Sequence, residues 1–161
     1  DRKLFELMVL DAFQAGLSWR TVLHKRKNFE KAFDNFDPVK ISKYSHAKIN
    51  SLMSNAGIIR NRLKIQGTVK NAQAFLRIQE KHRRFDAFIW QFVHGKPKIN
   101  RWKTEKQIPA RSKESDAMSV ALKEAGFTFV GSTICYAFMQ AAGMVNDHVV
   151  SCFRHKIVTD I

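Results

Sequence analysis

Two glycines bracket the stretch GFTFVG at residues 126–131, and an apolar helical pattern follows directly. Gly126 stands where the residue after a helix end takes a left-handed backbone, and Gly131 opens the next helix without a side chain. Free N–H groups and the positive dipole end of such a helix form an anion site, to which the Ser132 and Thr133 hydroxyls can add donors. The stretch therefore predicts a phosphate site; the alternative is an ordinary helical hairpin, since helix-glycine-helix connections are common.

The overall charge favours the first interpretation. The chain has 28 Lys and Arg against 14 Asp and Glu, a formal net charge of +14. Such an excess favours polyanions, meaning nucleic acid or an acidic membrane surface, and the alternative is a generic solvated basic surface. No apolar run is long enough to span a bilayer, and nothing resembles a signal peptide. With Cys135 and Cys152 as the only cysteines, a disulfide framework is excluded, and we expect an intracellular, cytoplasmic protein.

Helices must position these residues. The 161 residues, 45% of them hydrophobic, suffice for one globular domain over 1–161, or for two small lobes around a pocket. Apolar periodicity predicts helices over residues 4–15, 18–34, 49–56, 65–76, 85–93, 115–125 and 131–141, with a short helix starting at Asp37-Pro38. The basic segment 94–113 reads as a surface loop. No alternating strand pattern of useful length occurs, so the sequence predicts an all-α fold.

Several segments together resemble a known family. They are FQAGLSWRTVLHKR, FDPVKI, NAGIIRNRLKI and FTFVGSTICYAFMQAAGMVNDHVVSC, which extend over nearly the whole chain. They are similar to bacterial 3-methyladenine DNA glycosylase I, a family of the helix-hairpin-helix DNA glycosylase superfamily. The resemblance implies a base-excision repair enzyme that flips 3-methyladenine out of double-stranded DNA, hydrolyses its N-glycosidic bond and releases the free base. It also makes GFTFVG the hairpin, so that Gly126, Phe127, Thr128, Gly131, Ser132 and Thr133 are expected to bind DNA.

The resemblance assigns the base pocket to QAGLSW and the helix before it. Leu17, beside Gly16 on a tight turn, would be the apolar wedge that fills the gap in the base stack. Trp19 would stack on the base, which methylation at N3 makes cationic, through a cation–π interaction. Asp11 stands where the family has Glu, and we expect it to bind the base edge and to serve as the catalytic carboxylate. The alternatives are core packing for Leu17 and Trp19, and for Asp11 either a helix surface or burial with a partner.

A structural zinc ion also follows from the resemblance. The family uses two Cys and two His, and here His148 and Cys152 match two of these ligands. Their H-x3-C spacing would put both side chains on one face of a helical turn. The other two ligands belong to an N-terminal segment of the family; the chain begins at Asp1 without Met, so we expect that segment to be missing here. The alternative is a surface His and a buried Cys without metal.

Catalysis in this family is expected to rely on the lability of the cationic base. Asp147, shortly after the second helix of the hairpin, remains a second candidate for the catalytic carboxylate, because many related glycosylases carry an Asp in that neighbourhood. No lysine suggests Schiff-base chemistry, so we expect a monofunctional hydrolase acting as a monomer. Two alternatives remain open: a non-catalytic DNA-binding module that uses the same hairpin, and a related glycosylase with another lesion specificity, which Asp11 would make plausible.

Overall fold

The computed structural model describes residues 1–159, and these form a helical fold with a single short strand pair. The α-helices are α1 (Arg2–Gln14), α2 (Trp19–Ala32), α3 (Pro38–Ile41), α4 (His46–Ser54), α5 (Arg62–His82), α6 (Phe85–Trp90), α7 (Lys113–Glu124), α8 (Ser132–Ala141) and α9 (Phe153–Thr159). The 3-10 helices are η1 (Asp34–Phe36), η2 (Gln91–Val93) and η3 (Glu105–Gln107). The prediction of an all-α fold is confirmed.

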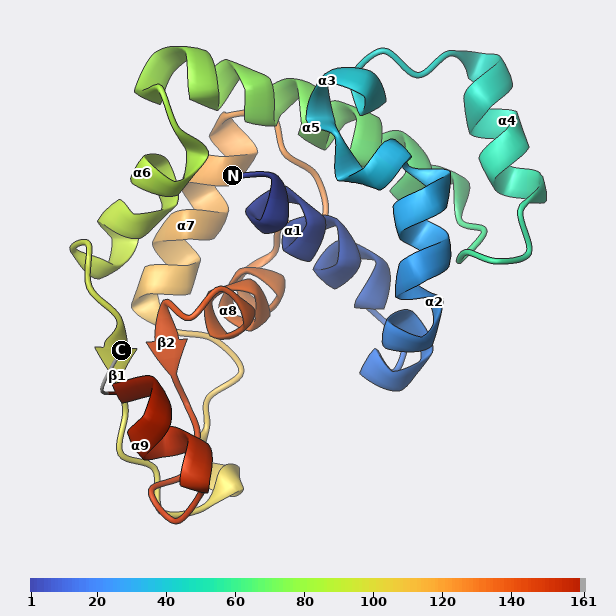
Figure 1. Ribbon diagram of the computed structural model, residues 1–161. Coiled ribbons are helices and arrows are strands. Elements are labelled where there is room, and N and C mark those ends of the chain that lie inside the picture. Colours follow the sequence, from blue (N-terminus) through green and yellow to red (C-terminus); the bar gives the residue numbers. More distant parts are fainter. Residues whose placement is uncertain (160–161) are drawn as a thin grey trace.

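The long helix α5 lies along one side of the molecule, and α1 runs through the middle between α5 and α8 (Figure 1). The strand pair, η3 and α9 form a smaller region at the opposite end from α4. Within residues 1–159, no helix combines the length and the apolar character needed to cross a membrane.

Aromatic side chains fill the core around α1. Phe13 packs edge-on against Phe29, with ring centroids 4.8 Å apart, and Phe5 packs in the same manner against Phe75 at 5.1 Å. All four rings are fully buried. Because edge-to-face aromatic pairs contribute beyond the area that they bury, these contacts fix α1 between α2 and α5.

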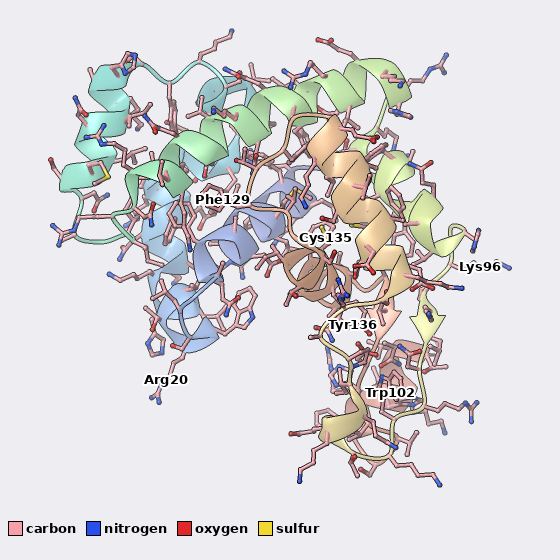
Figure 2. The ribbon with its side chains drawn as sticks, turned by 180° about the vertical axis from the view of Figure 1, so that it is seen from behind. Arg20, Lys96, Trp102, Phe129, Cys135 and Tyr136 are labelled. Atoms are coloured by element: carbon pink, nitrogen blue, oxygen red, sulfur yellow. The ribbon has the colours of Figure 1, made fainter. Side chains whose placement is uncertain are left out.

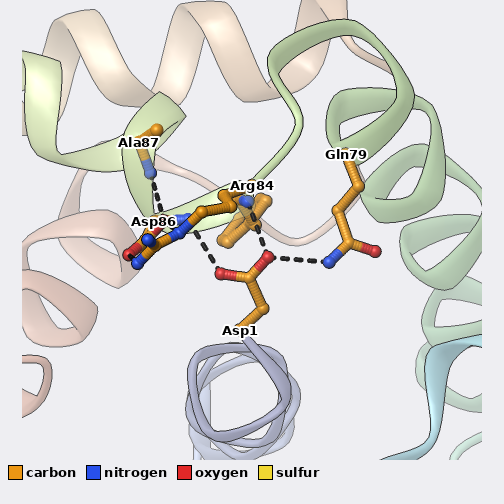
Figure 3. Close-up of polar contacts among 6 residues, drawn as sticks. Asp1, Gln79, Arg84, Asp86 and Ala87 are labelled. Atoms are coloured by element: carbon orange, nitrogen blue, oxygen red, sulfur yellow. Dashed lines mark hydrogen bonds and ion pairs between the residues drawn. The ribbon is translucent and has the colours of Figure 1, made fainter.

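The start of α1 is held by its first residue. The Asp1 carboxylate accepts hydrogen bonds from the amides of Phe85 at 2.7 Å and Asp86 at 3.1 Å, and from Gln79 Nε2 at 2.7 Å (Figure 3). The two amides belong to the first turn of α6, where backbone N–H groups have no partner within the helix. Asp1 therefore ties the beginning of α1 to α5 and α6.

The segment 94–113, expected to be a surface loop, contains regular structure. Its strand β1 (Lys98–Ile99) pairs in parallel with β2 (Val145–Asn146), and Lys98 lies opposite Val145. Strands of this length carry no readable alternation, which is why the pattern of apolar residues did not predict them. The pairing matters for the site because it brings Asn100 beside the residues that follow α8.

Candidate functional site

Helix α7 ends in a turn that two backbone hydrogen bonds close. The Gly126 amide donates to Lys123 O, and the Phe127 amide donates to Leu122 O, each at 2.9 Å. This pair of bonds requires a left-handed residue after the helix end, and Gly126 has a φ of +96°. The predicted dependence of this turn on glycine is confirmed.

Helix α5 holds the same turn from the side. Asn71, which is 2% exposed, donates from Nδ2 to Thr128 O at 3.0 Å and accepts from the Thr128 amide at 2.7 Å. Phe129, labelled in Figure 2, lies against Gly67, where an added Cβ would be 2.7 Å from its ring. The hairpin between α7 and α8 is therefore fixed by α5 as well as by its own hydrogen bonds.

The backbone amides in the first half of residues 126–131 already have hydrogen-bond partners, which limits how Gly126, Phe127 and Thr128 could bind a phosphate. The amides of Gly126, Phe127 and Thr128 are bonded internally, and the Phe127 side chain is buried. Among residues 1–159, no acceptor is hydrogen-bonded to the amides of residues 129–134, and Gly131 begins α8 without a side-chain cap. A phosphate site in this turn would therefore use Gly131, Ser132 and Thr133, whose amides point out of the start of a helix.

The turn between α1 and α2 carries the predicted wedge. Gly16 has a φ of +81°, and the neighbouring Leu17 is 41% exposed. Ser18 caps α2 by accepting from the Thr21 amide at 3.3 Å, so α2 begins at Trp19. Leu17 thus stands on the surface and not in the core, and Trp19 follows on the first turn of the next helix.

A cavity of about 390 Å³ separates the start of α2 from the end of α8 and from β2. Its walls are formed by Trp19, Ile108, Ala137, Gln140, Ala141, Val145, Asp147 and His148. In Figure 2 this cavity lies between the part of α2 that carries Arg20 and the smaller region that contains Trp102. The structure therefore brings Trp19 together with Asp147, although 128 positions separate them in the sequence.

Asp147 is held by a set of donors from different elements. Its carboxylate accepts hydrogen bonds from Asn100 Nδ2, Trp102 Nε1 and Gln140 Nε2, each at 2.7 Å. Burial alone raises the pKa of this carboxyl, but hydrogen bonds from Tyr136 and from these three side chains outweigh burial, so the pKa lies below its ordinary value. Asp147 is therefore a fixed negative charge in the cavity wall.

Asp11 differs from Asp147 in almost every respect. It is fully buried on α1, which packs against α8, and neither carboxylate oxygen has a hydrogen-bond partner among residues 1–159. Burial raises the pKa of Asp11 to about 7. The expectation that Asp11 and Trp19 line one cavity is not met, because Asp11 lies inside the helix packing and is absent from the cavity wall. A buried carboxylate without a partner is costly and calls for a functional explanation.

The predicted zinc ligands lie close together. Cys152 Sγ is 3.7 Å from His148 Nδ1. The segment between them is a turn closed by the Cys152 amide on Val149 O at 2.8 Å, and α9 starts only at Phe153, so the expected helical turn is wrong. One thiol and one imidazole are donors that zinc prefers, but a closed site needs four. Within residues 1–159, no group of three or more His, Cys, Asp or Glu side chains could hold a metal ion.

Sequence reasoning missed the donors around Asp147 and the anchor of the hairpin. Asn100 and Trp102 lie in the segment taken for a loop, Gln140 on a helix and Asn71 on another. A local signal for these residues is lacking, because each acts on a partner that is distant in sequence or on the backbone of another element. These features define a class of protein: a basic, mainly helical protein with a cavity between an aromatic and an ionised side chain, lined by a helix whose start is unblocked.

Comparisons with known proteins narrow this class to a family. The family model described as Methyladenine glycosylase matches residues 1–155. "DNA-3-methyladenine glycosylase 1" of Escherichia coli (strain K12) is 49% identical over 151 residues, covering 94% of this chain and 81% of that protein. "DNA-3-methyladenine glycosylase" of Haemophilus influenzae (strain ATCC 51907 / DSM 11121 / KW20 / Rd) is 46% identical, covering 94% of this chain and 82% of that protein.

Solved structures agree with this result. A crystal structure of 3-methyladenine DNA glycosylase I has a TM-score of 0.92 and 48% identity, and covers 94% of this chain and 84% of that chain. A structure on 3-methyladenine recognition by the Staphylococcus aureus 3-methyladenine DNA glycosylase I has a TM-score of 0.92 and 33% identity, with coverage of 94% and 81%. The chain therefore belongs to the methyladenine glycosylase family, as the resemblance predicted.

The left-handed turn at Gly126 yields a stability prediction. We expect Gly126→Ala to lower the free energy of unfolding by about 1–2 kcal/mol, because a Cβ is strained at positive φ, and here it would also lie 2.7 Å from an Arg77 guanidinium nitrogen. Gly131→Ala is the matched control, since its φ is −63° and no atom lies within 4 Å of the added Cβ. Urea denaturation of both variants measures the difference; equal losses would contradict the assignment.

The buried Asp11 carboxyl yields a pH prediction. Its pKa is about 7 in the folded chain, against 3.8 ordinarily. Between these values the unfolded chain loses the proton more readily than the folded chain, so the free energy of unfolding falls as the pH rises from about 4 to about 7. We expect Asp11→Asn to gain stability relative to the native chain over that interval, reaching roughly 2–4 kcal/mol at pH 8. The cost of burying the amide is independent of pH, so the pH dependence is the diagnostic quantity. Denaturation curves at pH 5 and pH 8 measure it, and a constant difference between the two proteins would count against a neutral Asp11.

Proposed function

We propose that this protein is a monofunctional DNA glycosylase that hydrolyses the N-glycosidic bond of 3-methyladenine in alkylated double-stranded DNA and releases the free base. The observation that carries the proposal is the cavity that joins Trp19 to Asp147 at the end of α8, in a member of this family whose α8 also has an open start. We propose further that the protein acts as a monomer in the bacterial cytoplasm.

The chemistry of the lesion explains what the cavity must supply. Methylation at N3 makes the base cationic and its glycosidic bond labile, and the base leaves as a neutral molecule. Proton transfer to the leaving group is therefore less important than holding positive charge. The aromatic face of Trp19 attracts a cationic base more strongly than neutral adenine. The ionised Asp147 carboxylate in the same wall adds a negative charge, but it already accepts hydrogen bonds from four side chains, which makes it unsuited to proton transfer.

Asp11 gives a second contribution to selectivity in this proposal. With a pKa of about 7, its carboxyl is close to half neutral at neutral pH. A cation held against α8 would favour ionisation of Asp11, and the ionised form would in turn stabilise the cation. A neutral adenine would provide no such compensation, so the burial cost of the charge would act against it. Asp11 has one methylene group fewer than the Glu expected from the family. The shorter side chain fits an electrostatic role from inside the helix packing, in place of direct contact with the base edge.

DNA binding in this proposal uses the two turns. The amides of Gly131, Ser132 and Thr133 would bind a phosphate of the damaged strand, while Leu17, supported by the bend at Gly16, would enter the stack where the base has left. Gly126, Phe127 and Thr128 would form the turn and shape it, without donating to the phosphate. The net charge of +14 favours the approach of DNA.

The activity is tested by release of 3-methyladenine from methylated duplex DNA by the full-length protein, measured by chromatography. We expect Trp19→Ala to lower kcat/KM by roughly 30-fold, the loss of a desolvated cation–π contact, and Trp19→Phe to lose less. Asp11→Asn is expected to lose at least about tenfold, because its charge is removed. Both substitutions should leave binding to undamaged DNA largely unchanged.

The outcomes separate the alternatives. DNA binding by the native protein without release of any base would identify a non-catalytic binding module. Release of a different methylated base would indicate another lesion specificity. Full activity in both Asp11→Asn and Trp19→Ala would show that the base pocket lies elsewhere.

We also propose that His148 and Cys152 supply two of the four ligands of a structural zinc ion. The support is the 3.7 Å approach of an imidazole nitrogen to a thiol. When bound, the zinc would hold the end of the chain next to β2, with no part in the reaction.

The zinc proposal is tested by the metal content of the full-length protein. We expect about one zinc per chain, as in structural sites with a closed ligand set, and we expect Cys152→Ser to lose it. Cys135→Ala is the matched control, because Cys135 is buried and hydrogen-bonded to Val130 O at 3.4 Å, away from His148. Equal zinc content in the native protein and in Cys152→Ser, measured by elemental analysis, would exclude these ligands.

A further inference from the structure

The turn that carries Leu17 is closed on itself by hydrogen bonds within residues 14–17. The Leu17 amide donates to Gln14 O at 2.7 Å, and Gln14 Nε2 donates to Leu17 O at 2.7 Å. These bonds fix the shape of the turn, but they do not fix its position relative to the rest of the molecule. Since Gly16 has an added freedom at positive φ and Leu17 is exposed, the turn needs an external anchor if Leu17 is to point in one direction.

Lys64, at the start of α5, supplies that anchor. Its Nζ atom donates to Phe13 O at 3.0 Å and to Ala15 O at 2.7 Å. The last carbonyl groups of a helix have no partner within the helix and form the negative end of its dipole, so an ammonium group is favoured there. Partial burial lowers the pKa of Lys64, in keeping with an ammonium group that has left water to make these bonds.

Lys64 is distinguished from other contacts of this turn by its position in the fold. Lys64 lies 51 residues after Phe13 and 49 residues after Ala15, the two residues whose carbonyl groups it binds. Among residues 1–159, no other side chain from outside α1 and the turn is hydrogen-bonded to the backbone of residues 13–17. Lys70, the next lysine on α5, is exposed and makes no hydrogen bond of this kind within the described chain.

We propose that Lys64 is a positioning residue for the wedge: by holding the end of α1 against α5, it directs Leu17 into the gap that the extruded base leaves. This inference rests on the proposed function for the role of Leu17. In the absence of the ammonium group, the turn keeps its internal hydrogen bonds but loses its fixed direction, so Leu17 enters the stack less often. The expected consequence is slower base extrusion with little change in the affinity for undamaged DNA.

The first test needs no catalysis. A duplex carries a stable abasic analogue, with 2-aminopurine as the base opposite, so that the fluorescence reports the filling of the gap. We expect the native protein to change this fluorescence, Leu17→Ala to lose most of the change, Lys64→Met to lose a large part, and Lys64→Arg to restore it in part. Lys81→Met is the matched control, because Lys81 is an exposed lysine on the same helix, far from the turn in sequence. A native response in Lys64→Met would overturn the proposal.

The second test is a double-mutant cycle on the single-turnover rate of 3-methyladenine release. We expect Lys64→Met to slow this rate roughly ten- to a hundredfold, because a small misplacement has effects of that size. The double variant Leu17→Ala/Lys64→Met should be no slower than Leu17→Ala alone, since Lys64 acts through Leu17. Multiplicative effects would overturn the proposal.

Two controls keep these tests decisive. Thermal denaturation confirms that each variant is folded, and Lys64→Gln replaces Lys64→Met if the latter is not. If the native protein binds the duplex but releases no base, the proposed function fails while the fluorescence test still decides the role of Lys64.

Discussion

Helix α5 sets the spacing of the two turns that face the proposed DNA. At one point, Lys64 binds the last carbonyl groups of α1, and seven residues later Asn71 binds both backbone groups of Thr128. A rigid helix rises about 1.5 Å per residue, so these anchors stand about 10 Å apart along its axis. Gly67 lies between them and lets Phe129 approach α5 closely. The wedge and the phosphate site are therefore fixed to one rigid body.

The sequence allowed prediction of those parts of the site that depend on local backbone chemistry. The turn at Gly126 requires a glycine because it has a positive φ and is closed by two backbone hydrogen bonds, and this feature can be predicted from a few neighbouring residues. Helix positions followed from the spacing of apolar residues, which burial against α1 and α5 imposes. The roles expected for Leu17, Trp19 and Asp11 rested on a family resemblance, because the residues alone favour core packing for Leu17 and Trp19 and leave Asp11 either on a helix surface or buried with a partner.

Parts of the site that depend on long-range contacts could not be predicted. Asn100 and Trp102 reach Asp147 only because β1 pairs with β2, and a pairing of two residues per strand leaves no periodic signal. The partners of the hairpin amides could not be predicted either, because the Thr128 amide donates to Asn71 on α5, which lies 57 residues earlier in the sequence. The separation of Asp11 from the cavity follows from the packing of α1 on α8, which no local pattern describes.

The two aspartates show how one site can hold a charge and respond to one. Asp147 remains ionised because donors from four side chains outweigh the cost of burial. Asp11 has no donor among the described residues, so burial acts unopposed and its carboxyl is only about half ionised at neutral pH, a fraction that a nearby positive charge would raise. A permanent charge attracts any cation, whereas a carboxyl whose ionisation increases when a cation binds adds discrimination between a cationic and a neutral base. Burying Asp11 without a hydrogen-bond partner lowers the stability of the fold, and this discrimination is the reason for that cost. A carboxylate that was already hydrogen-bonded within the protein would not distinguish a cationic base from a neutral one.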